Sequence, residues 1–271
     1  MDPAELFNSG NVRVKKCRHG VFAYFVNDFY IGRSLDIYGE YCEEEAKVFQ
    51  QIVRPGMTAI EVGANIGTHT VVLARALGST GQLIVFEPQR TIYHLLCTNI
   101  CLNNLMNVAT YQAAAGRLCG STRVPYLNYF DDNNFGGIEL GKSPDGMTVP
   151  VIALDSLGLA QCDFIKIDVE GMELEVLHGA QATIDRFRPI LYLENDRKEH
   201  SRDLFEHLTR CRYRLYWHVS NLFNPVNFYG TRSNHFDGVV SVNMIGIPVE
   251  APSDVTGFSE ITSIENCTWP I

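Results

Sequence analysis

The sequence predicts an α/β fold built on a mostly parallel β-sheet. From residue 57 onward, short runs rich in β-branched residues alternate with helical segments of about 10–13 residues, a pattern typical of βαβ crossovers. A loop with two glycines separates the first of these strands from the helix that follows it. The chain has 271 residues, of which 46% are hydrophobic, so it is long enough to bury the core of one large domain.

The expected elements follow one another in a regular order. Strands are expected at residues 57–62, 82–86, 108–112, 164–167, 190–193, 213–219 and 239–247. Helices are expected at residues 43–53, 68–77, 91–103, 173–185 and 201–209. Pro55 follows the first of these helices and Gly78 ends the second. The loop between the last two strands contains no clear helix, so this pair can be antiparallel.

Three segments depart from the alternation. The N-terminal extension, residues 1–54, carries aromatic, strand-like runs at 21–26 and 29–31. Residues 117–150 are rich in Asp, Asn, Gly and Pro, which predicts an irregular insertion. We therefore expect a ligand-binding domain over residues 55–250 and a C-terminal tail over residues 251–271.

Charge and composition exclude several kinds of partner. With 31 acidic and 22 basic residues the net charge is −9, which argues against nucleic acid or an anionic membrane surface as the main partner. No apolar stretch approaches the roughly 20 residues of a membrane span. The first residues lack the basic-then-apolar order of a signal peptide. The eight cysteines contain no C-x-x-C pair, so we expect reduced thiols in a cytoplasmic protein.

The glycine loop has the sequence Glu61-Val-Gly-Ala-Asn-Ile-Gly-Thr68. Gly63 permits a tight turn and Gly67 permits close packing at the start of the helix. Asn65 stands where a dinucleotide fingerprint has its middle glycine, and asparagine tolerates a left-handed backbone. Free N–H groups around Gly67 and Thr68 favour an anionic ligand group. The loop therefore predicts a ligand site at the carboxyl edge of the sheet.

Glu87 ends the second expected strand, where an acid can accept hydrogen bonds from both ribose hydroxyls. Together with the glycine loop it predicts a site for a nucleoside cofactor. NAD would place its phosphates beside the acidic Glu61, whereas S-adenosylmethionine brings an ammonium and a sulfonium to that end of the loop. Charge therefore favours a methyltransferase over an NAD-dependent dehydrogenase.

A second group of acids follows the strand expected at 164–167. We expect Asp168 and Glu170 to face the cleft, where burial raises the pKa of a carboxyl group and suits it to act as a general base. The alternative is that they cap the following helix. With Glu194 and Asp196 from the next strand, Asp168 also offers oxygen ligands to Mg²⁺, although strand-end acids are common without a metal.

His218 is a third candidate for the catalytic base. It ends the strand expected at 213–219, before a loop rich in aromatic and amide side chains that would suit a sugar-like acceptor. A lone histidine beside a tryptophan is also commonly a buried structural residue. Both interpretations are open from the residues alone.

Three segments resemble the FkbM family of S-adenosylmethionine-dependent methyltransferases. They are residues 61–68, residues 86–88 and above all the run Ile167-Asp-Val-Glu-Gly-Met-Glu173. The similarity extends from about Ile31 to Asn195 and more weakly beyond. It implies a Rossmann-like, class I methyltransferase sheet of seven strands with the last strand antiparallel. It also implies methylation of hydroxyls on sugars or secondary metabolites or, in some members, of peptide amide nitrogens.

The resemblance implies a role for each matching residue. Asp168 and Glu170 would face the transferred methyl group, and Asp168 would also belong to the cofactor site. Ala114 would lie near the adenine. The ribose would be held by Glu87, and the methionine part by Glu61, Gly63, Asn65, Gly67 and Thr68.

Four functions are compatible with this sequence. The first is O-methylation of a small-molecule or glycan hydroxyl. The others are N-methylation of a peptide amide, an NAD-dependent oxidoreductase or epimerase, and a non-catalytic nucleoside-binding module. Residues 1–30, 117–150 and those from 250 onward match no family pattern, so we expect acceptor specificity to reside there.

Overall fold

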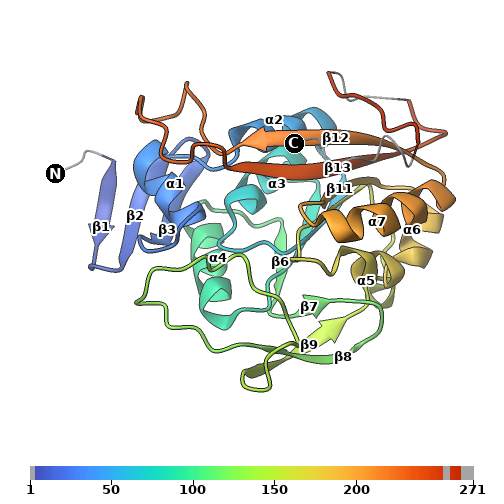
Figure 1. Cartoon of the computed structure of the whole chain (residues 1–271), viewed down its shortest axis with the longest axis horizontal. Helices are drawn as coiled ribbons and strands as arrows, with labels where there is room; N and C mark the ends of the chain where they lie inside the picture. The colour runs from blue at the N-terminus through green and yellow to red at the C-terminus, as the bar shows by residue number, and fades with distance from the viewer. Residues whose placement is uncertain (1–3, 253–256, 264–271) are drawn as a thin grey trace.

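A seven-stranded sheet runs through the centre of the protein, which is described by a computed structural model over residues 4–252 and 257–263 (Figure 1). The strand order is β12-β13-β11-β10-β4-β5-β6. The strands are β4 (Thr58–Val62), β5 (Gln82–Phe86), β6 (Val108–Tyr111), β10 (Phe164–Ile167), β11 (Ile190–Glu194), β12 (Tyr213–Asn221) and β13 (Val240–Pro248). Only the last strand, β13, runs antiparallel to its neighbours β11 and β12, and the other pairings are parallel. The α/β class and the class I methyltransferase arrangement are thus confirmed.

Helices cover both faces of this sheet. One face packs against α2 (Glu43–Ile52), α3 (Thr68–Leu77) and α4 (Arg90–Leu102). The other packs against α5 (Glu173–His178), α6 (Gln181–Phe187) and α7 (Lys198–Arg210). Because successive residues of a strand point to opposite faces, Ile165 faces the second layer while Phe164 faces the first. The carboxyl ends of β4, β10 and β11 meet at one edge between the two helical layers.

The N-terminal segment forms a separate three-stranded sheet of β1 (Glu5–Asn8), β2 (Val12–Cys17) and β3 (Gly20–Phe25). The Asn99 amide on α4 bonds to the backbone N–H and C=O of Ala23 at 2.7 and 3.0 Å. Asn103 does the same for Val21. These amides satisfy the open edge of β3, so the extension is attached to the central domain. The division at residue 54 stays a prediction.

The prediction of a strand-like run at residues 29–31 is wrong. Residues 28–30 form a turn, and α1 (Ile31–Tyr38) begins there instead. The Asp28 carboxylate accepts the N–H groups of Tyr30 and Gly32, both at 3.2 Å, which starts the helix. Aromatic residues fit either structure, and the preceding acid decides between them.

The helix expected at 173–185 is interrupted at Gly179 and Ala180, between α5 and α6. The side chain of Asp155, on the short 3₁₀ helix η1 (Leu154–Leu157), accepts the N–H groups of Ala182 and Thr183 at 2.9 and 2.7 Å. A Cβ atom at Gly179 would lie 2.0 Å from the carbonyl oxygen of Gly116. Contacts from a distant segment therefore break the helix.

The segment at 117–150 is less irregular than expected. Its two ends are strands β8 (Gly120–Val124) and β9 (Met147–Ile152), which pair with each other and, through β9, with β7 (Ala114–Ala115) (Figure 1). Only the stretch between β8 and β9 lacks regular strands.

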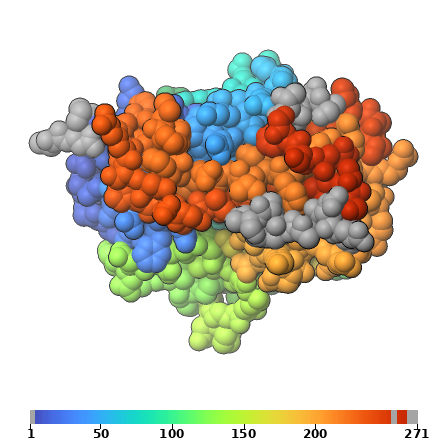
Figure 2. Space-filling view, turned by 45° about the horizontal axis from the view of Figure 1, so that its top comes forward, coloured from blue at the N-terminus to red at the C-terminus, as the bar shows by residue number. Residues whose placement is uncertain are grey.

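The loop between β12 and β13 lies over the N-terminal segment. Figure 2 shows this loop, in orange, against the blue N-terminal residues. The Arg18 guanidinium donates to the carbonyl oxygen of Val226 at 2.6 Å, and Glu40 accepts the N–H of Phe228 at 2.8 Å. Segments from opposite ends of the chain thus border one side of the ligand edge.

Two further findings concern membrane spans and thiols. Within the described ranges, no helix combines the length and the apolar character needed to cross a membrane. Seven cysteines in those ranges are free thiols, and Cys267 lies outside them, as does much of the tail expected at 251–271.

Candidate active site

A cavity of about 310 Å³ opens at the carboxyl edge of β4, β10 and β11. It joins the two regions that the sequence singled out, the glycine loop and the second group of acids. Four of the predicted residues, Glu61, Gly67, Ala114 and His218, do not line it. The six that do line it are Gly63, Asn65, Thr68, Glu87, Asp168 and Glu170.

The glycine loop is shaped by three residues with left-handed backbones, Gly63 at φ +80°, Asn65 at φ +51° and Gly67 at φ +88°. A Cβ atom at Gly63 would lie 1.7 Å from the carbonyl oxygen of Asp168, so only glycine lets these two loops approach each other. Gly67 precedes the first residue of α3. The loop therefore brings the amino end of α3 and the end of β10 to the same cavity.

Glu87 connects the glycine loop to the end of β5. Its Oε2 accepts the N–H of Asn65 at 2.9 Å, and its Oε1 accepts the N–H of Gln89 at 2.8 Å. Burial raises the pKa of Glu87 to about 7, although these two backbone hydrogen bonds oppose the rise. Each oxygen keeps a further lone pair, so this side chain can also accept ribose hydroxyls.

Glu61 lies beneath the cavity rather than on its surface. Its side chain is fully buried, and its Oε2 accepts the Thr70 hydroxyl at 2.6 Å, whereas Oε1 has no hydrogen-bond partner within the described ranges. Burial raises the pKa of Glu61 to about 7, opposed by the charge of Lys166 and the bond from Thr70. Glu61 thus acts on the cavity through its neighbours.

Lys166 is the main residue that the sequence analysis missed. It is 2% exposed, and its Nζ reaches the Oδ2 of Asp168 at 2.8 Å. Burial alone would lower its pKa, but the carboxylates of Asp168 and Glu61 outweigh burial and raise it. Parallel pairing places Lys166 directly beside Glu61. The signal was a lysine inside the otherwise apolar strand β10.

Glu170 adopts a left-handed backbone at φ +55°, which turns its side chain into the cavity. Its Oε2 accepts a bond from Arg197 Nη2 at 2.8 Å, while Arg197 Nη1 bonds to Glu139 in the insertion at 2.7 Å. Burial and the nearby Asp168 raise the pKa of Glu170 to about 7, and Arg197 opposes the rise. Arg197 and Glu139 had no recognisable sequence signal.

No side-chain hydrogen bond caps the amino end of α5, and the acid that bonds to the backbone there serves the preceding loop. The Oε1 of Glu173, in the first turn of α5, accepts the N–H groups of Gly171 at 3.1 Å and Val169 at 3.3 Å. Asp168 is instead paired with Lys166, and Glu170 with Arg197. Neither of the two predicted site acids therefore caps the helix.

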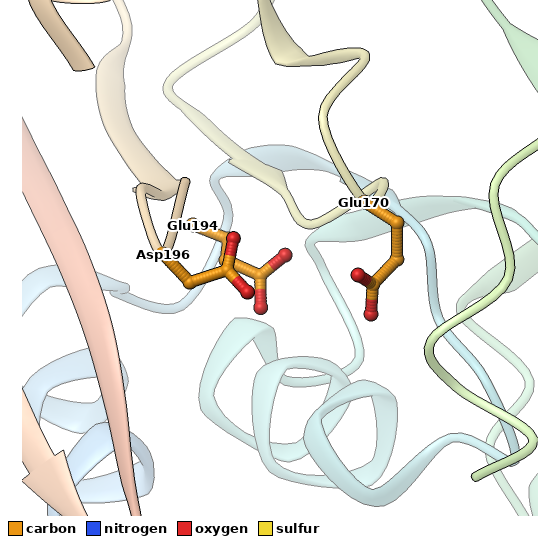
Figure 3. Close-up of side chains that lie close together, drawn as sticks. All are labelled: Glu170, Glu194 and Asp196. Carbon is orange, nitrogen blue, oxygen red and sulfur yellow. The ribbon is translucent and has the colours of Figure 1, made fainter. Parts of the chain in front are cut away.

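Three carboxylates converge at the end of β11. Figure 3 shows Glu170, Glu194 and Asp196 directed toward a common space, and one oxygen from each lies within 4.8 Å of the others. The group expected for Mg²⁺ named Asp168 with Glu194 and Asp196. The structure instead brings Glu170 into the trio, since Asp168 is engaged by Lys166.

His218 lies inside β12, not in a loop at the cleft. Its Nδ1 is 2.8 Å from the hydroxyl of Tyr192, and the ring is 6% exposed. Burial lowers its pKa to about 4. Strand β12 extends to Asn221, so His218 lies within the strand and is paired with Asn243 of β13. This placement matches the structural role.

Ala114 lies in a second, small cavity beside the main one. It shares that cavity with Pro88 and Val169, and with Gly63. The insertion borders the main cavity through Asn134 and Gly136, near Asn65, and the Gln89 amide donates to the carbonyl oxygen of Phe135 at 2.7 Å. The insertion therefore lines the side of the cavity where Glu87 stands.

Comparison with known proteins identifies the family. The Methyltransferase FkbM domain model matches residues 61–215, more than half of the chain. Methyltransferase sdnD of Sordaria araneosa is 27% identical in a match covering 44% of this chain and 59% of that protein, so the chain spans about three fifths of this relative.

Two solved methyltransferase structures are similar at lower identity. Methyltransferase FkbM from Methylobacillus flagellatus KT has 16% identity and a TM-score of 0.45, over 74% of this chain and 50% of its own. A SAM-dependent O-methyltransferase from Thermotoga maritima has 14% identity and a TM-score of 0.49, over 89% and 78%. On the match of the family model, the chain belongs to the FkbM family of S-adenosylmethionine-dependent methyltransferases.

Proposed function

We propose that this protein transfers the methyl group of S-adenosylmethionine to a hydroxyl of a sugar, glycan or secondary metabolite. One observation carries the proposal. A single cavity joins the glycine loop and Glu87, which suit a nucleoside cofactor, to Asp168 and Glu170, which suit proton transfer. The acceptor and the reacting methyl can therefore meet in one cavity.

The donor set fits this cofactor. Glu87 offers acceptor lone pairs for ribose hydroxyls, and the amino end of α3 at Thr68 favours the methionine carboxylate. The acids at the other end attract the positive charges of the ammonium and sulfonium. When bound, the cofactor supplies an electrophilic methyl group next to these acids.

Glu170 is the residue that we assign as general base. Its carboxylate accepts the proton of the acceptor hydroxyl as the oxygen attacks the methyl group. The ion pair with Arg197 orients this carboxylate, and a pKa of about 7 places its ionised form within the neutral range. Asp168, whose Oδ2 pairs with Lys166 at 2.8 Å, places a second acidic side chain beside Glu170 that can face the sulfonium.

The wall across from Glu87 suits an organic hydroxyl compound. Tyr30 and Tyr41 contribute aromatic rings, Leu222 and Val239 contribute apolar surface, and Ser241 contributes a hydroxyl. Rings beside hydrogen-bonding groups are the surfaces that bind sugars and polyketide-like molecules, which carry both apolar faces and hydroxyls. Tyr30 precedes α1 and Tyr41 precedes α2, whereas the other three come from the loop between β12 and β13 and from the start of β13.

The proposal is tested by following a labelled methyl group from S-adenosylmethionine into a panel of hydroxylated sugars, aglycones and short peptides. We expect label on a hydroxyl oxygen, and a rate lowered about 10²–10⁴-fold in Glu170→Gln. The control is Glu175→Gln, since that side chain on α5 is 47% exposed and outside the cavity. Label on a peptide nitrogen, or full activity of Glu170→Gln, contradicts the assignment.

A further inference from the structure

The cavity gathers more acidic than basic side chains, and burial together with the neighbouring acids raises the pKa of Glu194 well above its ordinary value. Among its lining residues stand the carboxylates of Glu45, Glu87, Asp168, Glu170, Glu194 and Asp196, and the ammonium of Lys166. Lys166 is paired with Asp168, and Arg197, just outside the lining, is shared between Glu170 and Glu139. Among the described residues, Glu194 therefore has no ion pair, and Asp196 has only a 3.9 Å approach of Arg197.

Glu194 shows most directly that a partner is missing. Its Oε2 is buried and accepts no hydrogen bond from the residues that the structure describes. Glu194 is also one of the three acids that each place one carboxylate oxygen within 4.8 Å of the others. In Figure 3 this side chain points into the space that Glu170 and Asp196 also face. A buried carboxylate oxygen without a donor is costly, so this position is built for a group that donates hydrogen bonds.

From this geometry we infer that Glu170, Glu194 and Asp196 bind a protonated amino group of the methyl acceptor, and we call these three residues the amine subsite. The inference rests on the proposed O-methylation and names the acceptor class as amino-bearing hydroxyl compounds, such as amino sugars. An ammonium has three N–H donors and no acceptor, which matches three convergent carboxylates. Acceptors that carry a carboxylate or phosphate are repelled by the same charges.

The amino group serves as an anchor rather than as the nucleophile. Three carboxylates stabilise its protonated form, and a protonated amine has no lone pair with which to attack a methyl group. The attacking atom is then a neighbouring hydroxyl, whose proton passes to Glu170 while the S–CH₃ bond breaks and the O–CH₃ bond forms. Arg197 occupies Glu170 Oε2, so Glu170 Oε1 contacts the amine through one lone pair and can receive this proton through the other.

A singly charged group suits this space better than a divalent metal ion. The Arg197 guanidinium lies 2.8 Å from Glu170 Oε2 and 3.9 Å from Asp196 Oδ1, so any cation held by the trio lies near an existing positive charge. A dication beside that guanidinium meets twice the repulsion that an ammonium meets. The experiment below distinguishes binding of an amine from binding of a metal ion.

The test uses three sugars that differ in one substituent. Protein saturated with S-adenosylhomocysteine is titrated calorimetrically with glucosamine, glucose and glucuronate, in the presence of a chelator. We expect glucosamine to bind about tenfold or more tightly than glucose, as charge-assisted hydrogen bonds predict, and glucuronate to bind most weakly. Glu194→Gln and Asp196→Asn should each reduce this preference about tenfold. Asp203→Asn on α7, which removes an exposed charge outside the cavity, should leave it unchanged.

Several results overturn the inference. Equal binding of the three sugars, binding of none, or a preference that survives in both cavity variants shows that the trio does not recognise an amine. Sugar binding that requires Mg²⁺ and is lost with Glu194→Gln shows a metal site instead. The preceding S-adenosylhomocysteine titration separates the two proposals, since its failure counts against the methyltransferase function and its success leaves only the amine subsite in question.

Discussion

Replacing Glu61 by glutamine tests how the buried charges beneath the cavity affect stability. The folded protein holds the pKa of Glu61 at about 7, whereas an unfolded glutamate ionises near its ordinary value. Between these two values the folded state binds more protons than the unfolded state, so the free energy of unfolding falls as the pH rises. The loss begins above the unfolded pKa and is complete above the folded one.

The size of the effect follows from that pKa. From about pH 6 to about pH 8, a carboxyl group with a folded pKa of about 7 lowers the free energy of unfolding by about 1.3 kcal/mol. Glu61→Gln does not titrate and still offers an oxygen to Thr70, so its free energy of unfolding should fall by about 1.3 kcal/mol less than that of the wild type over this interval.

The assay is urea unfolding of the ligand-free protein at a series of pH values across this range. Glu175→Gln serves as the control, because that side chain is 47% exposed. We expect the control to follow the wild-type curve and Glu61→Gln to diverge from it with a flatter slope. Parallel curves for Glu61→Gln and the wild type would refute the claim that burial raises the pKa of Glu61.

Three further predictions concern the cavity. Glu87→Ala should weaken binding of S-adenosylhomocysteine by about 1–3 kcal/mol in calorimetry, because hydrogen bonds to a carboxylate are lost, and unchanged affinity would remove Glu87 from the ribose site. Lys166→Met leaves Asp168 and Glu61 without their buried cation, so chemical denaturation should show a loss of about 3–5 kcal/mol, and an unaltered midpoint would contradict this role. The general base must be ionised, so kcat/KM should rise to a plateau above about pH 7, the pKa of Glu170. Arg197→Gln should move the midpoint of that rise upward, and a flat profile would exclude Glu170 as the base.

The elements with strong local patterns were predictable from the sequence. The structure confirms the helix at 68–77 and the strands at 82–86 and 164–167 at the expected residues. Glycine spacing and strand-end acids also located the cavity, because parallel strands bring their carboxyl ends to one edge. Each of these patterns lies within a few neighbouring residues, so it can be recognised without knowledge of the tertiary structure.

The features that were missed depend on residues far apart in the chain. Arg197 joins Glu170 to Glu139, which is 58 residues away from it, and local sequence does not reveal such a contact. His218 was misplaced because β12 runs on to Asn221, and only its pairing with β13 shows that the strand continues. Lys166 was identified as part of a strand, but its position beside Glu61 of β4 requires the sheet register.

The central claim is that the cavity binds S-adenosylmethionine, and parallel calorimetric titrations with S-adenosylhomocysteine and NAD test it most directly. The arrangement of Glu87, the glycine loop and the acids predicts saturable binding of S-adenosylhomocysteine with a dissociation constant on the order of micromolar, and no binding of NAD. Binding of NAD alone would contradict the account, because the excess of carboxylates in this cavity should repel a pyrophosphate.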